Sequence, residues 1–406
     1  MGEWKKYKLV EFMEFNPKIS LKKNTLARKI TMDQLVPHSR DVYSWSYEPY
    51  SGGAKFQNGD TIMARITPCL ENGKHAFISL LDENEIAYGS TEYIVMRGKA
   101  NISDNLFVYY LTHFPNFKDA AIKSMVGSSG RQRAQVDVLK NLIMKLPSLQ
   151  EQQKIASILS SLDDKIEVNR RINENLEQQA QALFKSWFVD FEPFKNGEFV
   201  ESELGMIPKG WRVGRADEVY EINIGKTPPR KEQEWFSEKK EDNIWVSISD
   251  MGSCGTFISD SSEYLTNDAI ERFNIRMVDK GSVLLSFKLT VGRVAIADTK
   301  LTTNEAIARF ILPQSCYREF LYLYLRRYKY ENLGSTSSIA TAVNSKTIKG
   351  MKLIIPSERI ISDFSKYIKP LFDKIRDSLQ ESRRLASLRD TLLPKLMSGE
   401  LKVNEL

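Results

Sequence analysis

The sequence repeats itself, and this repeat limits the folds open to the chain more than any other feature. The segment NLIMKLPS at 141–148 aligns with GMKLIIPS at 350–357, a shift of 209 residues. Near the start of each half, Trp4 aligns with Trp211 at a shift of 207. Self-similarity at a fixed spacing indicates a repeated structural unit. The sequence therefore predicts two successive copies of one structural plan.

The interior of each half contains a second shared pattern. The segment RITPCLENGKHAFI, which begins at Arg65, resembles KLTVGRVAI, which begins at Lys288. Each has a basic residue, an aliphatic residue and a threonine, followed by Gly-Lys or Gly-Arg and an apolar stretch, which predicts a hairpin-like segment. Short strands are expected at TEYIVMR and EAIARFIL, and helices near NLFVYYLTHF and REFLYLYLRRYKY. Both halves are therefore expected to be α/β or α+β domains.

A long helix is predicted after each domain. From Ile155 and from Phe364, residues recur in alternating steps of four and three, which is the heptad pattern of a coiled-coil seam. The first seam contains Ile155, Leu159, Leu162, Ile166, Asn169, Asn173, Leu176, Ala180, Leu183 and Trp187. The second seam contains Phe364, Ile368, Leu371, Ile375, Ser378, Ser382, Leu385, Arg389, Leu392 and Leu396. Ser148 and Glu151, just after Pro147, form an S-x-x-E pattern that marks the start of the first helix.

The two seams become polar at the same two steps. Asn169 and Asn173 occupy these steps in the first helix, and Ser378 and Ser382 occupy them in the second. Polar seam residues lower stability but fix the register of paired helices, so we expect the two helices to pair with each other. Only a short linker joins the first helix to the second domain, which favours antiparallel pairing. The alternative is two amphipathic helices that pack on separate cores.

These patterns predict an α/β (α+β) tandem pseudo-repeat, with two globular domains separated by two long antiparallel coiled-coil helices. The first domain is predicted at 1–147, the central spacer helix at 148–191, the linker and second domain at 192–356, and the C-terminal spacer helix at 357–406. A helix of about 38 residues extends roughly 57 Å, because each residue rises ~1.5 Å. The helices are therefore expected to act as spacers between two similar domains.

The charge is distributed in blocks. Lys and Arg exceed Asp and Glu by five in residues 1–147 and by four in 204–356, whereas acidic residues exceed basic ones by five in 148–203. Basic domains favour a polyanionic partner, of which nucleic acid is the most common. The alternative is a merely solvated surface, since the net charge of the whole chain is only +6.

The composition excludes several classes of protein. No run of about 18 apolar residues exists, and MGEWKKYKLVEF lacks the apolar segment of a signal peptide, so a cytoplasmic location without membrane association is expected. Neither a disulfide framework nor a zinc cluster is expected, because the cysteines and histidines lie far apart in the sequence. They are Cys69, Cys254, Cys316, His38, His75 and His113. No metal site is predicted.

Three motifs together resemble the helical regions of the specificity subunit of type I restriction-modification enzymes. They are LPSLQEQQKIASILSSLDDKIEVNRRINENLEQQAQALFKSWFVDFEPF, ELGMIPKGW and LRDTLLPKLMSGELKV. The resemblance spans the chain in outline. It implies two target recognition domains, each of which reads one half of a split duplex DNA sequence. It also implies that the helices separate these domains, set the gap and hold two adenine methyltransferase subunits.

The resemblance extends to further partners and to cofactors. Nuclease-translocase subunits join some complexes of this kind, so a modification-only methyltransferase complex without a nuclease is an alternative. S-adenosylmethionine, ATP and magnesium are expected on the partner subunits, and no cofactor is expected on this chain. A coiled-coil scaffold that does not bind DNA is a third alternative, which salt-sensitive binding to duplex DNA would exclude.

The chain is not expected to be an enzyme in its own right. It has no Asn/Asp-Pro-Pro-aromatic tetrapeptide of the kind that holds a flipped adenine, no G-x-G-x-x-G loop and no G-x-x-x-x-G-K-[ST] phosphate loop. A Glu-x-Lys pattern at Glu238 and Lys240 lies in the polar run SEKKEDN, where a solvated loop is the expected structure. No catalytic residue is therefore predicted.

The best candidates for contact with DNA are basic side chains near Gly-, Ser- or Thr-rich loops, where backbone can approach phosphate. They are Arg65, Lys74, Arg131, Arg133, Lys226, Arg230, Lys288, Arg293 and Lys346. Base-reading residues cannot be transferred through the resemblance, because the recognition domains vary within that family. Tyr43, Trp45 and Tyr47 alternate in DVYSWSYEPYSGG; a strand packed on one face is the expected structure, and stacking on bases is the alternative.

Overall fold

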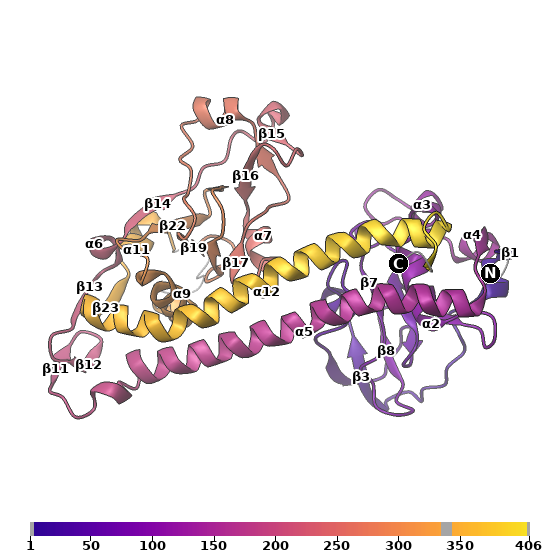
Figure 1. Cartoon of the computed structure of the whole chain (residues 1–406), viewed down its shortest axis with the longest axis horizontal. Coiled ribbons are helices and arrows are strands. Elements are labelled where there is room, and N and C mark those ends of the chain that lie inside the picture. Colours follow the sequence, from indigo (N-terminus) through magenta and orange to yellow (C-terminus); the bar gives the residue numbers. More distant parts are fainter. Residues whose placement is uncertain (1–3, 334–342, 404–406) are drawn as a thin grey trace. The chain divides into compact units, whose positions relative to one another are not determined.

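The computed structural model describes residues 4–333 and 343–403, and the chain divides into two compact units. Unit 1 consists of residues 1–169 and 381–406, and unit 2 consists of residues 170–380. Each unit contains one α+β domain together with part of two long helices (Figure 1). The predicted fold class is therefore confirmed in each half of the chain.

Both long helices predicted from the seams are present. Helix α5 spans Leu149–Phe188 and helix α12 spans Glu358–Ser398. Helix α5 begins directly after Ser148, as the sequence predicts. Gly399 directly follows α12, and its φ of 76° is a left-handed conformation that glycine adopts without strain. Strong helix formers such as Leu, Gln, Glu and Lys fill much of both segments, which supports helix at the exposed positions.

Unit 1 contains, within the described residues, two four-stranded sheets and a two-stranded ladder. The antiparallel sheet β2-β9-β6-β7 is formed by β2 (Met13–Phe15), β9 (Tyr93–Gly98), β6 (Thr61–Ala64) and β7 (His75–Phe77). The mixed sheet β4-β3-β8-β5 is formed by β4 (Ser46–Pro49), β3 (Leu26–Ile30), β8 (Ala87–Gly89) and β5 (Lys55–Phe56). The ladder pairs β1 (Lys5–Lys8) with β10 (Ile143–Leu146). The shorter helices are α1 (Leu9–Phe12), 3-10 helix η1 (Met32–Gln34), α2 (Asn105–His113), α3 (Pro115–Lys123) and α4 (Val136–Asn141).

Unit 2 is built in the same way. Its main sheet β14-β22-β19-β20-β17 is formed by β14 (Glu221–Ile224), β22 (Ile307–Ile311), β19 (Val283–Ser286), β20 (Val294–Ala297) and β17 (Phe257–Ile258). Its second sheet β15-β18-β16-β21 is formed by β15 (Phe236–Ser237), β18 (Tyr264–Leu265), β16 (Asn243–Val246) and β21 (Thr302–Thr303). Two ladders pair β13 (Arg212–Arg215) with β23 (Lys352–Ile355) and β11 (Phe199–Ser202) with β12 (Gly205–Pro208). The shorter helices are η2 (Glu192–Phe194), α6 (Ala216–Val219), η3 (Gln233–Trp235), α7 (Ile248–Ser253), α8 (Asn267–Arg272), α9 (Tyr317–Arg327), η4 (Tyr330–Leu333) and α11 (Ser345–Lys349).

The predicted repeat is confirmed strand by strand. Strand β10 aligns with β23 at a shift of 209 residues, and β1 aligns with β13 at a shift of 207. The two hairpin-like segments are the antiparallel pairs β6–β7 and β19–β20. The order β2-β9-β6-β7 matches β14-β22-β19-β20, and unit 2 adds β17 beside β20. One plan, sheet followed by long helix, therefore occurs twice.

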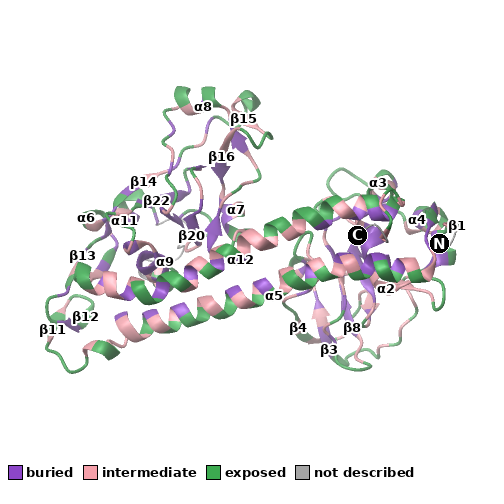
Figure 2. Ribbon diagram, viewed as in Figure 1, coloured by how far each residue is buried: buried purple, intermediate pink, exposed green. Residues whose placement is uncertain are grey.

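Each core forms where a helix covers the main sheet and the long helices close over it. In unit 1, α2 packs on β9, β6 and β7, and in unit 2, α9 packs on β19 and β20. Ile155 and Leu159 of α5 and Leu396 of α12 enter the core of unit 1. Phe184 of α5 and Phe364 of α12 enter the core of unit 2. Figure 2 shows that buried residues recur along both long helices, as the heptad pattern requires.

Helices α5 and α12 pair antiparallel within each unit, which confirms the predicted orientation. In unit 1, the Asn169 amide donates to Ser382 Oγ (3.3 Å) and to Glu381 Oε2 (2.7 Å). In unit 2, the ring of Phe364 lies 4.8 Å from Phe188 and 5.5 Å from Trp187, centroid to centroid. Residue numbers rise along α5 as they fall along α12, so the helices run in opposite directions.

Candidate nucleic-acid interface

Two of the predicted DNA-contact residues converge on one carboxylate in unit 1. Arg65 Nε donates to Glu92 Oε2 (3.1 Å), and Arg133 donates through Nε and Nη2 to Glu92 Oε1 (2.9 and 2.8 Å). Glu92 immediately precedes β9, and Arg65 immediately follows β6. The two guanidinium groups, Arg133 first, hold the pKa of Glu92 below its usual value. The three side chains therefore form one fixed, partly exposed cluster.

The loop that carries Arg131 and Arg133 is attached to this cluster through its backbone. Ile66 forms an isolated antiparallel bridge with Arg133, and the Thr67 amide donates to the carbonyl of Gln132 (3.0 Å). The Arg133 Nη1 group donates to the carbonyl of Arg131 (3.1 Å). The exposed Arg131 guanidinium itself donates no hydrogen bond to any described residue. Arg65, Arg131 and Arg133 are thus brought together, as two basic side chains fixed by Glu92 and one exposed beside them.

Lys74 and Arg293 have a structural role at their positions. The Lys74 ammonium donates to the carbonyl of Met32 (2.7 Å), and Arg293 Nη1 donates to the carbonyl of Ile248 (2.6 Å). Both side chains are half-buried. Loss of a donor from a partly buried carbonyl is costly. Lys74 and Arg293 therefore stabilise the fold of their domains through these bonds.

Arg230 of unit 2 is held by aromatic rings and a carboxylate. Its guanidinium carbon lies 4.5 Å from the ring centroids of both Phe236 and Trp245. It also donates to both oxygens of Glu263 (2.7 and 2.9 Å). Nearby, the Lys226 ammonium donates to the carbonyls of Phe273 and Asn274 (3.0 and 3.1 Å).

Lys288 and Lys346 are exposed basic residues of unit 2. Lys288 lies just after β19 at the tip of the hairpin, next to Leu289, which is 84% exposed. Lys346 lies in the short helix α11. The loop that was expected to precede Lys346 lies mostly at 334–342, outside the described residues.

Trp45 and Tyr47 were expected on a strand packed on one face; Tyr47 does lie on β4, and both rings pack on Arg28 but remain partly exposed. Trp45 is 40% exposed and Tyr47 is 53% exposed, and both flank the guanidinium of Arg28, at 4.8 and 5.5 Å from their ring centroids. Arg28 Nη2 also donates a hydrogen bond to the Tyr47 hydroxyl (2.9 Å). The aromatic rings therefore cover a buried arginine and leave their other faces to solvent, the surface on which bases can stack.

Sequence reasoning missed Glu92 and Arg28. The signal for Glu92 was present in the repeat, because the Thr-Glu before β9 corresponds to the Asn-Glu before β22, where Glu305 accepts a hydrogen bond from the Thr227 hydroxyl. Both halves thus place a carboxylate at the head of the same strand, next to candidate DNA-contact residues. No local pattern pointed to Arg28, whose aromatic partners lie on the neighbouring strand β4 and just before it.

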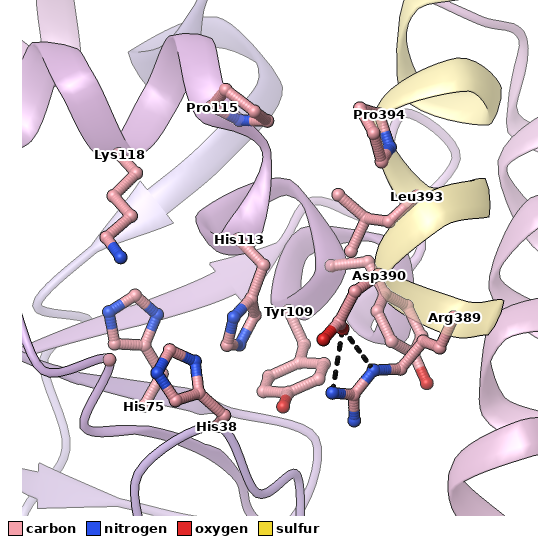
Figure 3. Close-up of a pocket in the computed structure, with 12 residues that line it drawn as sticks. His38, His75, Tyr109, His113, Pro115, Lys118, Arg389, Asp390, Leu393 and Pro394 are labelled. Carbon is pink, nitrogen blue, oxygen red and sulfur yellow. Dashed lines mark hydrogen bonds and ion pairs between the residues drawn. The ribbon is translucent and has the colours of Figure 1, made fainter. Parts of the chain in front are cut away.

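A cavity of about 250 Å³ in unit 1 collects all three histidines (Figure 3). The His75 and His113 rings lie 4.7 Å apart, and Lys118 and Arg389 also line the cavity. The Thr112 hydroxyl donates to the Tyr109 carbonyl, so His75 Nδ1 is the donor in its 3.0 Å bond to that hydroxyl. Burial, followed by the charge of Lys118, lowers the pKa of His75 to about 3.

The other two histidines are also kept neutral. Burial, and next the proximity of His75, lower the pKa of His113 well below its ordinary value. Burial, followed by the charge of Lys118, also lowers the pKa of His38. Among the described residues no group of three or more His, Cys, Asp or Glu side chains is arranged to hold a metal ion. In that same part of the chain, no helix is long and apolar enough to span a membrane.

Comparisons with known proteins agree with this architecture. The sequence matches the family described as Type I restriction modification DNA specificity domain over residues 1–178 and 208–381. It is 33% identical over 309 residues to the type I restriction enzyme MjaIX specificity subunit of Methanocaldococcus jannaschii, covering 74% of this chain and 70% of that protein. It is 28% identical over 411 residues to the HindI specificity subunit of Haemophilus influenzae, covering 85% and 87%. The crystal structure of a type I restriction-modification S subunit from M. genitalium has the same fold, with a TM-score of 0.54 at 15% identity over 98% of this chain and 96% of that one.

Proposed function

The chain belongs to the family of type I restriction-modification DNA specificity subunits, and on this premise we propose that each unit reads one half of a bipartite duplex DNA site. The α+β domains carry the basic side chains, and the family assigns DNA recognition to such domains. The chain itself supplies recognition and no chemistry. We further propose that methyltransferase subunits bring S-adenosylmethionine, and that any nuclease-translocase subunits bring the ATP and magnesium sites.

The observation that supports this proposal best is the cluster of Arg65, Glu92 and Arg133. Arg65 uses only Nε to bind Glu92, so its two Nη groups have no described partner. A guanidinium fixed at Nε presents its remaining donors as a fork, the geometry that suits phosphate oxygens or the O6 and N7 of guanine. Arg131, exposed on the adjoining loop, adds a charge suited to phosphate. The cluster and the neighbouring Arg131 therefore supply one oriented donor group and one exposed cation.

Helices α5 and α12 are proposed to bind two adenine methyltransferase subunits and to set the gap between the half-sites. Their lengths of 40 and 41 residues correspond to roughly 60 Å of helix at ~1.5 Å per residue. That length is on the order of the distance, measured along the DNA axis, that a bipartite site spans. Sequencing of methylated adenines in DNA from cells that contain this chain and its methyltransferase would report both half-sites and the gap together.

Exchange of residues 1–147 for the corresponding domain of another specificity subunit is expected to change one half-site and leave the other unchanged. The first domain has its own sheets and core in unit 1, so its replacement leaves the contacts of unit 2 intact. Maps of methylated adenines for the parent and the exchanged chain provide the measurement. A change in both half-sites would contradict independent reading.

Arg131→Ala is expected to weaken binding of the methyltransferase complex to duplex DNA and to reduce the slope of log K against log salt by about 0.9, because one phosphate contact is lost. Lys6→Ala is the matched control, since it removes the same charge from an exposed position on β1. Fluorescence anisotropy at several salt concentrations measures both slopes. Equal slopes for the two variants would place Arg131 outside the DNA interface.

Lengthening both helices tests whether they act as the ruler. The register in unit 2 that brings Trp187 to Phe364 also places Asn173 opposite Ser378. Four residues inserted after Asn173 and four before Ser378 add about 6 Å at ~1.5 Å each. Duplex DNA advances roughly 3.4 Å per base pair, so the preferred gap is expected to grow by about two base pairs. Four residues nearly complete a helical turn, which keeps the seam facing its partner.

The control for this experiment places the same four residues in the linker after Gly197, outside both helices. That variant is expected to keep the original gap. Maps of methylated adenines give the gap for both variants. A functional helix variant that still methylates sites with the original gap would show that the helices do not set the distance.

A further inference from the structure

Helices α5 and α12 are interchangeable at most positions of their seams. At the repeat shift of 209 residues, Leu162 aligns with Leu371, and Ile166 aligns with Ile375. An α5 helix from a second copy of the chain therefore offers α5 nearly the same apolar seam as α12 does. The seam pattern alone does not decide which of the two helices α5 takes as its partner.

One layer of the pairing in unit 1 breaks this equivalence. Asp163 of α5 accepts from Arg389 Nη1 of α12 (2.5 Å) and from the hydroxyl of Tyr110 of α2 (2.6 Å). The Asp163 side chain is 4% exposed and the Arg389 side chain is 10% exposed. Arg389 also binds the neighbouring carboxylate of Asp390 (2.8 Å), as Figure 3 shows. A charged pair is thus enclosed in unit 1, at a layer separate from the polar Asn169–Ser382 contact.

The equivalent layer of unit 2 is apolar. The repeat shift maps Asp163 to Phe372 and Arg389 to Ala180, and both of these residues are fully buried. The Phe372 ring packs 5.4 Å from Tyr322, centroid to centroid. The two halves therefore share a backbone plan, but this layer is charged in unit 1 and apolar in unit 2.

A pairing between equivalent helices would separate the charges. Antiparallel α5 helices from two copies would place each Asp163 opposite Ala180, and antiparallel α12 helices would place each Arg389 opposite Phe372. A buried charge that loses its partner is strongly unfavourable, by roughly a hundredfold or more in an equilibrium constant at each site. We propose that the buried Asp163–Arg389 pair makes α5 select the α12 of its own chain over the α5 of a second copy.

Charge reversal in two separate full-length chains tests this proposal. One chain carries Asp163→Arg and the other carries Arg389→Asp, so each chain alone has like charges at this layer. When equal amounts of the two chains are refolded together at micromolar concentration, exchange of α12 between them restores opposite charges in both copies of unit 1. We expect a one-to-one dimer in sedimentation velocity, at least tenfold more abundant than in either variant alone. A mixture with no more dimer than the separate variants would overturn the proposal.

A chain that carries both reversals is the matched control. Its opposite charges lie within one chain, so it is expected to refold with the same oligomeric state as the wild type. A double variant that exchanges helices as readily as the mixture would also overturn the proposal. This measurement does not involve DNA, so it stands or falls separately from the reading of half-sites.

A second variant tests selection against a second α5 directly. Tyr110→Phe, Asp163→Phe and Arg389→Ala together copy the apolar layer of unit 2 into unit 1 and leave no buried hydroxyl without a partner. Apolar replacement of a buried ion pair is usually neutral or stabilising, so this variant is expected to remain folded. On refolding at high concentration it is expected to form several-fold more dimer than the wild type, with α5–α5 crosslinks. Equal dimer yields would show that the ion pair contributes nothing to partner choice.

Discussion

Lowering the pH from 7 to 5 is expected to destabilise unit 1 by about 2 kcal/mol through His75 alone. The pKa of His75 is lowered from 6.5 to about 3 in the folded chain. Between these values the unfolded chain binds a proton that the folded chain does not, so stability is complete above about pH 6.5 and falls as the pH decreases. The full loss, reached near pH 3, is about 5 kcal/mol at ~1.36 kcal/mol per unit. Protonation of His113 adds to the loss in the same direction.

His75→Asn provides the test of this acid sensitivity. An asparagine amide replaces the Nδ1 donor to Thr112 and does not titrate in this range. Urea-dependent hydrogen exchange of the amides of α2, measured at pH 7 and pH 5, gives the stability of unit 1. The wild type is expected to lose about 2 kcal/mol more than His75→Asn between these pH values. Equal losses would mean that other groups cause the acid sensitivity.

His38→Asn is the matched control. His38 lies at the exposed edge of the same cavity with a φ of 59°, which asparagine tolerates better than most residues. Since His38 is more exposed than His75, the control is expected to keep most of the acid sensitivity of the wild type. The contrast between the two variants separates the buried imidazole from the rest of the cavity.

Phe364→Ala is expected to destabilise unit 2 by about 3–5 kcal/mol, the usual cost of removing a fully buried phenylalanine ring. Phe364 is completely buried, and its ring packs against those of Phe184, Trp187 and Phe188. Its loss leaves a cavity at the point where α5, α12 and the domain core meet. Because neither helix can move alone to fill this cavity, we expect the full loss of unfolding free energy.

Tyr367→Ala is the matched control for this variant. Tyr367 lies one turn further along α12 and is 62% exposed, so its removal is expected to cost less than about 1 kcal/mol. Urea unfolding followed by tryptophan fluorescence reports on unit 2, because most tryptophans of the chain belong to it. They are Trp187, Trp211, Trp235 and Trp245. Equal costs for the two substitutions would contradict the central role of Phe364.

The sequence by itself determined the repeat, the two long helices and the strands that match between the halves. These features follow from local periodicity, which a heptad seam or a hairpin pattern encodes within a few turns or strands. The antiparallel direction of the helices also followed, because the linker between the first helix and the second domain is short. Such features need only neighbouring residues to specify them.

Only the tertiary structure decided which basic residues are available to a ligand. Lys74 and Arg293 look like Arg65 and Arg131 in the sequence, yet their donors are bound to the carbonyls of Met32 and Ile248. Trp45 was expected on a strand packed on one face, and it packs on Arg28 while remaining partly exposed. A side chain's charge and size are local properties, but its partner depends on which distant segment the fold brings next to it.

The same reason explains the Asp163–Arg389 pair. In the sequence these residues are an ordinary acid on one helix and an ordinary base on another, 226 positions apart. Their burial depends on α2, α5 and α12 meeting in unit 1, and their mutual neutralisation depends on the antiparallel register. Periodicity determined that the helices pair, whereas the charge enclosed at one layer, visible only in three dimensions, distinguishes one pairing from another.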